Sequence, residues 1–471
     1  MKRVWLSGMA WLSLLGPARG QTPTPLDSVN RYITAEMERQ RIPGLSVAIL
    51  RGDQMLLSRG YGFANLELRV PASDSTIYQS GSLGKQFTAA AVAMLAERGQ
   101  LSLDDGIVKW LPEGAGVWNG IRVRHLLTHT SGIAEYTDST FDYRKDYTED
   151  QLVRFAASRP LDFPPGERWS YSNTGYAVLG VLVHRATGHF YGEILRDLIF
   201  APAGMRSTRI ISEADIVPNR SAGYQLLDGG IKNQDWVAPT LNTTADGSLY
   251  LSVNDLARWA VALNHRQTPS AAVLARAWTP VRLNNGGEYA YGLGWDLTEQ
   301  RGHPRIGHTG SWQGFKTALY RYPEPGLTVI VLANLAQAEP GAIAEGIAGI
   351  LAPPLQPPQL LPAALAGPRP PTPIPDLLAR IAGGTDSGVV TPGLRSFLSA
   401  AGRKELRDLL SNTGSWTDLG CDRVGGRKIT RLRAGIERIC YARGVREKSG
   451  VVASVYYTRD WRAANFDTGW F

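Results

Sequence analysis

The sequence predicts an α+β protein with a large domain and a small C-terminal domain. Strand-like runs lie near both ends of the first ~350 residues, and helical segments lie between them. This order indicates an antiparallel sheet that is assembled from distant parts of the chain, flanked by helices, with a helical subdomain in the middle. A proline-rich segment then separates this domain from a shorter stretch with its own helix and strand patterns.

Residues 1–20 have the layout of a cleavable secretory signal. Lys2 and Arg3 precede an apolar stretch, Val4 to Gly16, which is shorter than the ~20 helical residues that span a bilayer. The residue after the expected cleavage site is Gln21 rather than cysteine, so we expect no acylated cysteine to tether the mature chain. We therefore expect an exported, periplasmic or extracellular protein with no stable membrane anchor after signal cleavage.

Composition divides the mature chain into two domains. Ten of the 23 residues from 353 to 375 are proline, which favours an extended linker. We expect a large domain over residues 21–352 and an accessory domain over residues 376–471. The accessory domain carries 16 basic and 10 acidic side chains, within a chain of formal net charge +8. This modest surplus fits a solvated surface, and no basic-aromatic motif predicts a nucleic-acid partner.

Two hairpins and one buried helix are expected in the large domain. Gly44 to Leu50 and Met55 to Ser58 flank a turn that contains Gly and Asp. Phe315 to Tyr322 and Leu327 to Asn334 flank a Pro-Glu-Pro-Gly turn in the same way. Leu83 to Arg98 is rich in alanine and apolar on nearly every side, so this helix should lie inside the protein.

The run Ser82-Leu-Gly-Lys85 places a serine and a lysine three residues apart at the start of that helix. This spacing brings both side chains to nearly the same helix face. A serine nucleophile needs a base, and burial would lower the pKa of the lysine enough for its amine to serve. The helix N-terminus would also favour the attacking alkoxide. A phosphate-binding loop is excluded, because Gln79 and Gln86 occupy the positions where it needs Gly and Ser or Thr.

A second candidate element is Tyr171-Ser172-Asn173, which precedes an apolar helix from Tyr176 to Arg185. The phenol of Tyr171 can relay a proton between the serine and the leaving group. The amide of Asn173 can bind substrate while it holds the lysine. The alternative is structural, with Tyr171 as a packed aromatic residue and Asn173 as a helix N-cap.

The third candidate element is Gly307-His-Thr-Gly-Ser311, which precedes the second hairpin. An edge strand that carries Thr309 and two glycines lets its backbone approach a substrate closely. The N–H groups of Ser311 and Ser82 would then form an oxyanion hole, in which one donor contributes roughly 3 kcal/mol. The alternative is a glycine-rich turn between two strands.

In this order and spacing, the three elements resemble the motifs of the serine β-lactamase and D-alanyl-D-alanine peptidase superfamily, in particular its class C branch. Segments 125–133, 245–259 and 291–295 fit the same family, and the resemblance covers about residues 28–350. It implies the fold of that family, an antiparallel sheet flanked by helices with a helical subdomain, and a reaction through an acyl-enzyme.

The resemblance also implies a role for each residue near the serine. Ser82 would be the acylated nucleophile, and Lys85 and Tyr171 would share the proton transfers. Asn173 would position both Lys85 and the substrate. The resemblance leaves open which of Lys85 and Tyr171 activates the serine.

On the strand, the resemblance implies that His308, Thr309 and Gly310 bind substrate. β-Lactamases usually carry lysine where this chain carries His308, whereas peptidases and esterases of the family often carry histidine. This difference favours a peptidase or an esterase over an efficient β-lactamase. Tyr136 falls where the family often places a side chain that lines the cleft.

Two other catalytic types are disfavoured. His125 and His129 have the spacing of a helical zinc site, but Leu126 stands where such a site needs glutamate. Residues 80–84 carry serine where the first glycine of a Gly-x-Ser-x-Gly elbow belongs. We therefore expect neither a metal nor another cofactor.

The accessory domain is expected to pack one helix, Leu394 to Leu410, on a small antiparallel sheet. Strand-like runs cover Lys428 to Leu432, Ile436 to Tyr441 and Val451 to Thr458. Cys421 and Cys440 are the only cysteines, and in an exported chain they should form a disulfide. This domain carries no catalytic constellation, so it would contact the catalytic domain or a partner.

Together these features predict an exported serine hydrolase that cleaves a small-molecule or short-peptide substrate. The bond would be an ester, an amide or a D-amino-acid peptide, as in esterases, DD-carboxypeptidases or D-aminopeptidases. The alternative is a binding protein on the same fold, which acylates slowly or not at all and senses cell-wall peptides or β-lactams.

Overall fold

The computed structural model describes residues 24–136, 141–210, 215–239, 241, 244–266, 268–356, 365, 367–398, 400–423, 436–445 and 450–470. The expected signal, residues 1–20, lies outside these ranges. Within them, no helix combines the length and the apolarity that crossing a bilayer requires.

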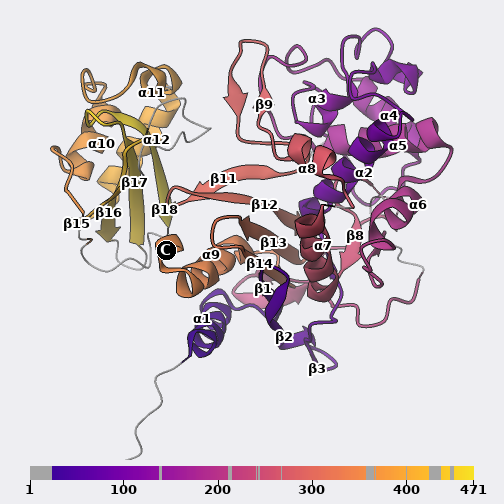
Figure 1. Cartoon of the computed structure of the whole chain (residues 1–471), viewed down its shortest axis with the longest axis horizontal. Coiled ribbons are helices and arrows are strands. Elements are labelled where there is room, and N and C mark those ends of the chain that lie inside the picture. Colours follow the sequence, from indigo (N-terminus) through magenta and orange to yellow (C-terminus); the bar gives the residue numbers. More distant parts are fainter. Residues whose placement is uncertain are drawn as a thin grey trace, which may run out of the picture.

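A seven-stranded antiparallel sheet forms the centre of the large domain, in the order β11-β12-β13-β14-β1-β2-β3 (Figure 1). Its strands are β1 (Gly44–Arg51), β2 (Gln54–Asn65), β3 (Val70–Pro71), β11 (Asp296–Gln300), β12 (His303–Trp312), β13 (Phe315–Tyr322) and β14 (Leu327–Ala333). The pairing of β1 with β14 joins the two ends of the domain. Both expected hairpins are therefore present, and they belong to one sheet.

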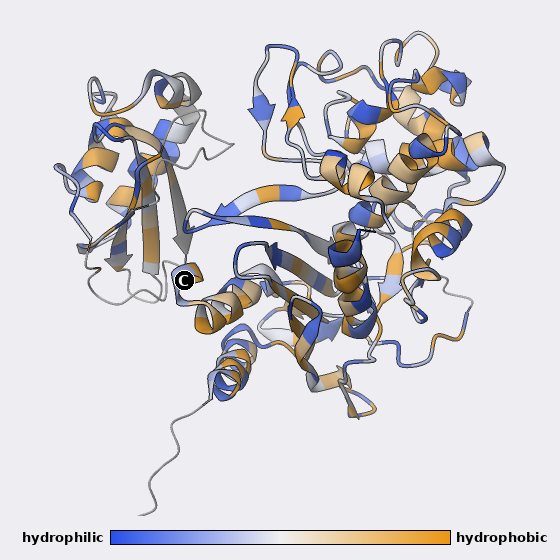
Figure 2. Cartoon of the chain, in the orientation of Figure 1, coloured by the Kyte–Doolittle hydropathy of each residue, from blue (hydrophilic) through white to orange (hydrophobic). Residues whose placement is uncertain are grey.

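Both faces of this sheet are buried, because alternate residues of its central strands enter two different hydrophobic cores. On β14, Val329 and Val331 join one core, whereas Ile330 and Leu332 join the other. The first core includes residues of α1 and α9, and the second includes residues of α2 and α7. The hydropathy colouring shows the predominantly apolar character of α9 (Figure 2). The bounds of these helices are α1 (Pro25–Gln40), α2 (Lys85–Glu97), α7 (Val253–His265) and α9 (Pro340–Leu351).

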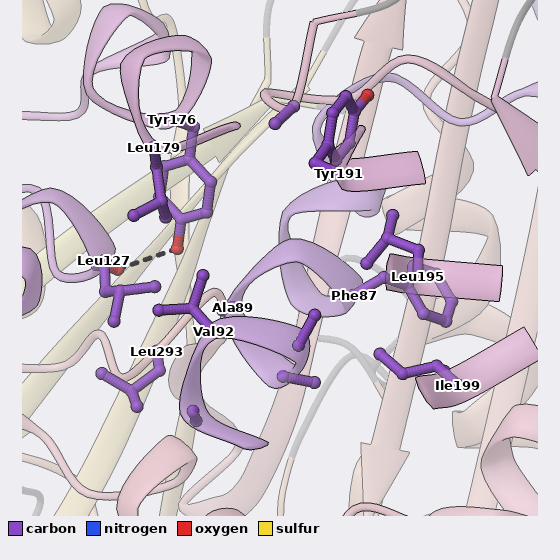
Figure 3. Packing of buried hydrophobic residues seen from close by; sticks show 14 of the residues in the cluster. Phe87, Ala89, Val92, Leu127, Tyr176, Leu179, Tyr191, Leu195, Ile199 and Leu293 are labelled. Carbon is purple, nitrogen blue, oxygen red and sulfur yellow. Dashed lines mark hydrogen bonds between the residues drawn. The ribbon is translucent and has the colours of Figure 1, made fainter. Parts of the chain in front are cut away.

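Helix α2 is the buried helix that the sequence predicts. Every residue from Lys85 to Leu95 is buried. Phe87 and Val92 pack among apolar side chains from several other segments, including Leu195 and Ile199 (Figure 3). The structure differs from the expectation at the N-terminal end, where residues Gly81–Gly84 form a 3-10 turn, η1, before α2 begins.

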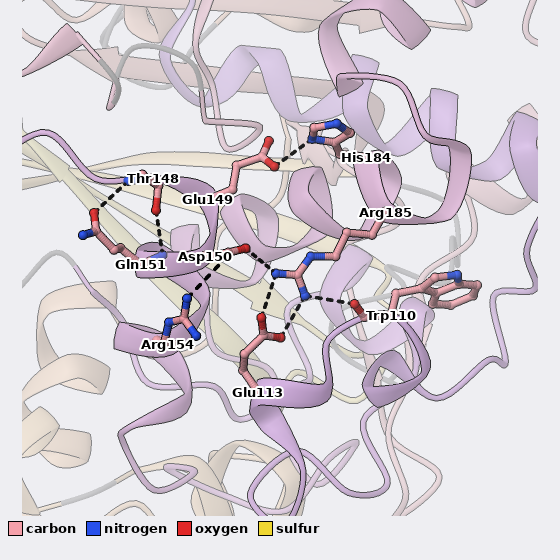
Figure 4. A network of polar contacts seen from close by, with 9 residues as sticks. All are labelled: Trp110, Glu113, Thr148, Glu149, Asp150, Gln151, Arg154, His184 and Arg185. Atoms are coloured by element: carbon pink, nitrogen blue, oxygen red, sulfur yellow. Dashed lines mark hydrogen bonds and ion pairs between the residues drawn. The ribbon is translucent and has the colours of Figure 1, made fainter.

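The helical subdomain is formed by the chain between the first and last strands of the sheet. Its elements are α3 (Val123–Leu127), α4 (Glu149–Ala157), α5 (Asn173–Thr187), α6 (Tyr191–Leu195) and α8 (Ala271–Ala277), with the short turns η2 (Ile107–Lys109), η3 (Pro112–Gly114) and η4 (Arg196–Phe200). An ion-pair network ties three of them together (Figure 4). Arg185 on α5 binds Glu113 on η3 and Asp150 on α4. These contacts hold the C-terminal half of α5 and leave its N-terminus to the candidate site.

Short strands complete the large domain. They are β4 (Tyr78–Gln79), β5 (Arg209–Ile210) and β8 (Leu249–Leu251) in one sheet, and the hairpins β6 (Tyr224–Leu227) with β7 (Gly230–Asn233) and β9 (Val281–Arg282) with β10 (Glu288–Tyr289). Strand β4 leads directly into the turn that carries Ser82. Its pairing with β8 fixes that turn against the segment that precedes Leu249.

The C-terminal domain is a four-stranded antiparallel sheet with three helices. Its elements are β15 (Trp416–Arg423), β16 (Arg438–Val445), β17 (Gly450–Tyr457), β18 (Ala463–Trp470), α10 (Ile374–Gly383), α11 (Pro392–Phe397) and α12 (Ala400–Ser411). Cys421 and Cys440 are paired across β15 and β16 and form the expected disulfide.

The helices of this domain correct the expectation of a single helix from Leu394 to Leu410. That stretch contains the greater part of two helices, α11 and α12, and α10 begins earlier, at Ile374, within the expected linker. Pro375 lies in the first turn of α10, where a helix tolerates proline because the missing N–H needs no partner. The expected strand from Lys428 to Leu432 lies outside the described residues.

Candidate active site

The turn that carries Ser82 lies directly against β12. Gly81 has φ +52°, and a Cβ atom there would lie 2.5 Å from the backbone nitrogen of Ser311. A Cβ atom on Gly310 would lie 2.0 Å from the carbonyl oxygen of Ser80. Only glycine fits at both positions, so the two backbones approach each other more closely than side chains would allow. This contact brings two of the predicted motifs together.

Lys85 lies beside Ser82, as the three-residue spacing predicts. Its Nζ atom donates to Ser82 Oγ at 3.0 Å, to Asn173 Oδ1 at 2.8 Å and to the carbonyl oxygen of Asp246 at 2.5 Å. The side chain is 0% exposed. Burial lowers its pKa to about 8, although the nearby carboxylates of Asp246 and Glu135 favour the charged form. Roughly a tenth of the amine is therefore neutral at pH 7, far more than for an ordinary lysine.

Asp246 reaches the lysine through the pairing of short strands. Ser80 donates its backbone N–H to the carbonyl of Leu249 at 2.8 Å and its hydroxyl to the carbonyl of Gly247 at 2.7 Å. These bonds hold the segment before β8 against the nucleophile turn. The sequence gives one signal that Asp246 belongs to the site, because it lies in the segment 245–259 that resembles the family.

Asn173 begins α5 and points its side-chain oxygen at Lys85. Ser172, not Asn173, is the N-cap of this helix, because its hydroxyl accepts from the N–H of Gly175 at 3.0 Å. The backbone N–H of Asn173 donates to Glu135 at 2.6 Å. Its side chain is therefore free of the capping role and binds the lysine.

Tyr171 packs its ring within 4.9 Å of Lys85 Nζ and 4.3 Å from the ring of His129, centroid to centroid. Its hydroxyl is buried and makes no hydrogen bond of ordinary geometry with the described residues. Burial is the largest influence and raises the pKa of Tyr171 well above its usual range, whereas the nearby Ser82 hydroxyl lowers it. The phenol is therefore neutral, and its buried hydroxyl lies close to the serine.

The third motif forms the edge of β12. Strand β11 pairs with β12 only from His303 to Gly307, so residues 308–311 have no partner on that side among the described strands. Thr309 and Ser311 are exposed, whereas His308 is 3% exposed. The strand edge therefore offers backbone groups next to the turn of Ser82, which agrees with an edge strand rather than a glycine-rich turn.

Tyr136 is buried and contacts the same residue, Asp246, as the lysine. Its side chain is 4% exposed, and its hydroxyl donates to the carboxylate of Asp246 at 2.9 Å. Its ring packs on Phe141, with the centroids 4.8 Å apart. The aromatic cluster around Phe141 covers its ring, and the expectation that Tyr136 lines the substrate cleft stays a prediction.

Two side chains near the site were not expected there from the sequence. His129 and Tyr291 are buried between Tyr171 and His308, and the hydroxyl of Tyr291 lies 3.1 Å from a ring nitrogen of each histidine. The sequence places His129 in segment 125–133, which fits the family, and at a spacing from His125 that is typical of a zinc site but lacks the glutamate. The segment 291–295 carried the one signal for Tyr291, as part of the resemblance.

The described residues contain no cluster of three or more His, Cys, Asp or Glu side chains that could hold a metal ion. His125 accepts the N–H of Arg122 through Nδ1 at 3.1 Å, and His129 accepts that of Ser172. An open groove of about 430 Å³ lies elsewhere, between the β1–β2 turn and α7, and includes none of the motif residues. The residues of the predicted motifs therefore lie around Ser82 and not in this groove.

Comparisons with known proteins agree with this geometry. The Beta-lactamase family model matches residues 29–352. Penicillin-binding protein 4* of Bacillus subtilis (strain 168) is 32% identical over 314 residues, which cover 63% of this chain and 69% of that protein. D-aminopeptidase of Gluconobacter oxydans (strain 621H) is 27% identical over 324 residues, which cover 67% of this chain and 60% of that protein.

Solved structures share the fold. The octameric penicillin-binding protein homologue from Pyrococcus abyssi has a TM-score of 0.64 at 25% identity, and the match covers 94% of this chain and 90% of that chain. A D-stereospecific amidohydrolase from Streptomyces sp. has a TM-score of 0.59 at 24% identity, with coverage of 69% and 98%. These matches show that the chain belongs to the β-lactamase family and is a serine hydrolase of that family.

Proposed function

We propose that this serine hydrolase works through an acyl-enzyme on Ser82. The observation that carries the proposal is the contact of 3.0 Å between Ser82 Oγ and the amine of Lys85, whose pKa is lowered to about 8. A neutral amine at this distance accepts the hydroxyl proton as the oxygen attacks. Without such a base, a serine hydroxyl at neutral pH is a poor nucleophile.

In the acylation step, Ser82 Oγ forms a bond to the carbonyl carbon of the substrate, and the hydroxyl proton passes to Lys85 or to Tyr171. When the tetrahedral intermediate collapses, the bond to the leaving group breaks and the leaving group takes that proton. Water then attacks the ester on Ser82, releases the acid and restores the serine. Asn173 supports these steps because it accepts from Lys85 at 2.8 Å and limits the directions in which the amine can point.

The strand edge would stabilise the negative charge that develops on the carbonyl oxygen. The close approach of Gly81 to the backbone of Ser311 supports an oxyanion hole formed by the N–H groups of Ser82 and Ser311. Preorganised backbone donors of this kind require no reorganisation during the reaction. His308, Thr309 and Gly310 would bind substrate along the same edge.

The substrate we propose is a small molecule or short peptide with an ester, an amide or a D-amino-acid peptide bond. The names D-aminopeptidase and penicillin-binding protein 4* of two relatives support this range. We also propose that residues 1–20 direct export, so that the mature enzyme works in the periplasm or outside the cell without a cofactor. The C-terminal domain would then contact the catalytic domain or a partner.

The experiment that tests this proposal follows the hydrolysis of 4-nitrophenyl acetate by the chain without residues 1–20. We expect a burst of 4-nitrophenol followed by turnover, and an acetyl group on Ser82 by mass spectrometry of the quenched enzyme. Ser82→Ala should abolish both. Labelling of Ser82 without turnover would favour the binding protein over the enzyme, and full activity in Ser82→Ala would overturn the proposed nucleophile.

A further inference from the structure

A chain of hydrogen bonds links the segment before α5 to the edge of β12 through three buried side chains. The N–H of Ser172 donates to His129 Nδ1 at 3.1 Å. The hydroxyl of Tyr291 lies 3.1 Å from His129 Nε2 and 3.1 Å from His308 Nε2. His308 Nδ1 lies 2.5 Å from the carbonyl oxygen of Thr309. The chain therefore connects two of the three motifs without passing through Ser82.

The two ends of this chain fix which atom donates in its first and last bonds. A backbone N–H can only donate, so Nδ1 of His129 carries no proton and its Nε2 donates to Tyr291. A carbonyl can only accept, so Nδ1 of His308 carries the proton and donates to Thr309. Tyr291 accepts from His129, and its own proton has two acceptors, Nε2 of His308 and the hydroxyl oxygen of Tyr176, which itself donates to the carbonyl of Leu127 at 2.8 Å. The bond to His308 is the one that satisfies Nε2 of a neutral ring. One neutral tautomer of each histidine satisfies all four contacts.

The surroundings of His308 keep its ring neutral. Burial is the largest influence and lowers its pKa below the usual range, and Lys85 lowers it further. Asp296 on β11 acts in the opposite direction, as does the bond to the carbonyl of Thr309. His129 is also buried, and its pKa is lowered well below the usual range. Both ring nitrogens of His308 are thus engaged, and neither offers a free N–H to a ligand.

Two lysines near this edge, among the described residues, do not replace that N–H. Lys85 already directs its amine at three oxygen atoms. Lys316 on β13 lies opposite Ser311, whereas Thr317 lies opposite Gly310. A Cβ atom on Gly310 would lie 2.3 Å from the hydroxyl oxygen of Thr317 and would point at the nucleophile turn. Lys316 therefore projects from the opposite face of the strand pair.

We propose that Tyr291, held by His129, is a positioning residue that locks His308 in one neutral tautomer, and that the site consequently selects uncharged leaving groups over leaving groups that carry a carboxylate. This inference rests on the proposed function and names its substrate class, esters and carboxamides whose leaving group is neutral. Among the described residues, neither Lys85 nor Lys316 offers an unpaired cation to a carboxylate along the edge that His308 occupies, so no ion pair compensates its desolvation.

The test compares two acetate esters that differ in one group, 3-acetoxybenzamide and 3-acetoxybenzoate, at pH 7.5. Their acyl groups are identical and their leaving phenols are similar, so the ratio of kcat/KM reports the response to the carboxylate. We expect the carboxamide to be preferred at least ~10-fold. Loss of folded enzyme lowers both rates equally and leaves this ratio unchanged.

Two variants test the role of the chain. Tyr291→Phe removes the hydroxyl and keeps the ring, so at pH 6 the freed nitrogen of His308 can bind a proton, and the preference should fall at least ~3-fold. His308→Lys places a cation at the edge and should bring the ratio to about one or below. Tyr322→Phe is the matched control: it removes the hydroxyl of a buried tyrosine at the far end of β13, bound to Gln300, and should keep the wild-type ratio.

Each outcome decides one question. A wild-type preference for the benzoate, or a ratio near one, overturns the substrate class. An unchanged ratio in both Tyr291→Phe and His308→Lys overturns the role of the chain, and so does an equal change in Tyr322→Phe. Failure to hydrolyse either ester, with no acetyl group on Ser82, overturns the proposed function itself.

Discussion

Two sides flank Ser82, and they differ in the kind of group that they present. The helix side consists of Lys85, Tyr171 and Asn173, where a lowered lysine pKa and an unpaired phenol lie within reach of the serine. The strand side consists of residues 308–311, where the one titratable side chain, His308, is neutral and hydrogen bonded at both nitrogens. The difference indicates a division of labour in which the helix side moves protons and the strand side binds and positions.

The two sides also depend on different features of the sequence. On the helix side, the chemistry requires particular side chains, because only a titratable group can take and return a proton. On the strand side, it requires the absence of side chains, because Gly81 and Gly310 allow the backbone to touch the turn of Ser82. Substitutions on the two sides should therefore fail for different reasons.

The largest effect is expected for Lys85→Ala. Loss of the general base should lower kcat for 4-nitrophenyl acetate about 10³-fold, because general acid–base catalysis contributes 10²- to 10⁴-fold. Lys85→Arg is the matched control, since it keeps a positive charge that does not deprotonate at accessible pH and should be as inactive. Thermal unfolding of both variants checks that they fold. More than a tenth of wild-type turnover in either would remove Lys85 from the proton transfer.

The next effect, about 10²-fold, is expected for Gly310→Ala on the strand side. The added methyl group would meet the carbonyl oxygen of Ser80 at 2.0 Å, so β12 has to move away from the nucleophile turn. A displacement of about 1 Å near the reacting atoms lowers the rate roughly 10²-fold. The pH dependence should stay as in the wild type, because the helix side is intact. Measured kcat/KM against pH separates this outcome from a loss of the base.

Gly106→Ala is the control for this substitution. Gly106 has φ −68°, and a Cβ atom there would find nothing closer than 4.0 Å. The variant should keep wild-type activity. If Gly310→Ala were equally active, the close contact between β12 and the turn would have no part in the reaction.

A smaller effect, about tenfold per pH unit, is expected from the titration of Lys85. Its neutral form is the base, so activity should rise as pH rises toward about 8 and level off above it, since the pKa is lowered to about 8 from 10.5. Measured kcat/KM for an uncharged ester between pH 5.5 and 9.5 checks the sign. A fall in kcat/KM over this pH range would mean that the protonated amine is the active form and that another group is the base.

The sequence predicts Ser82 and Lys85 better than it predicts the residues that hold the lysine in place. Ser82 and Lys85 are three residues apart, so helix geometry alone brings them together. Asp246 acts through a backbone carbonyl, which every residue carries, and only the pairing of β4 with β8 brings it to the lysine. Tyr136 has the side chain that the resemblance expects, and its hydroxyl bonds the carboxylate of the same Asp246. Long-range pairing of this kind has no local pattern in the chain.

The same distinction between local patterns and long-range contacts explains which elements of the C-terminal domain the sequence predicts. The strand-like runs predict the first half of β16 and nearly all of β17, because apolar residues fill most of these strands. Helix α10 was not predicted, because proline at its start looks like linker unless the core that receives Ile374 and Leu377 is known. Strand β18 was missed too, since its polar residues give no apolar run.

The smallest effect on activity is expected where the strand side meets the C-terminal domain. Arg301 lies between β11 and β12, and the hairpin of these strands extends toward the C-terminal sheet (Figure 1). Its side chain is 10% exposed, donates to Asp422 through Nε at 2.8 Å and lies 5.8 Å from the ring centroid of Tyr441. This contact is at the opposite end of β12 from residues 308–311.

Arg301→Ala should therefore change kcat/KM less than ~2-fold but loosen the domain contact by about 1–2 kcal/mol, less than a fully buried ion pair because Asp422 is partly exposed. Calorimetry should then separate two unfolding transitions, and Arg301→Lys, which keeps the charge and the left-handed backbone position, should give a smaller change. A tenfold loss of activity in Arg301→Ala would mean that docking of the C-terminal domain sets the position of the strand edge. The strand side would then extend along all of β12, and substrate selection would depend on both domains.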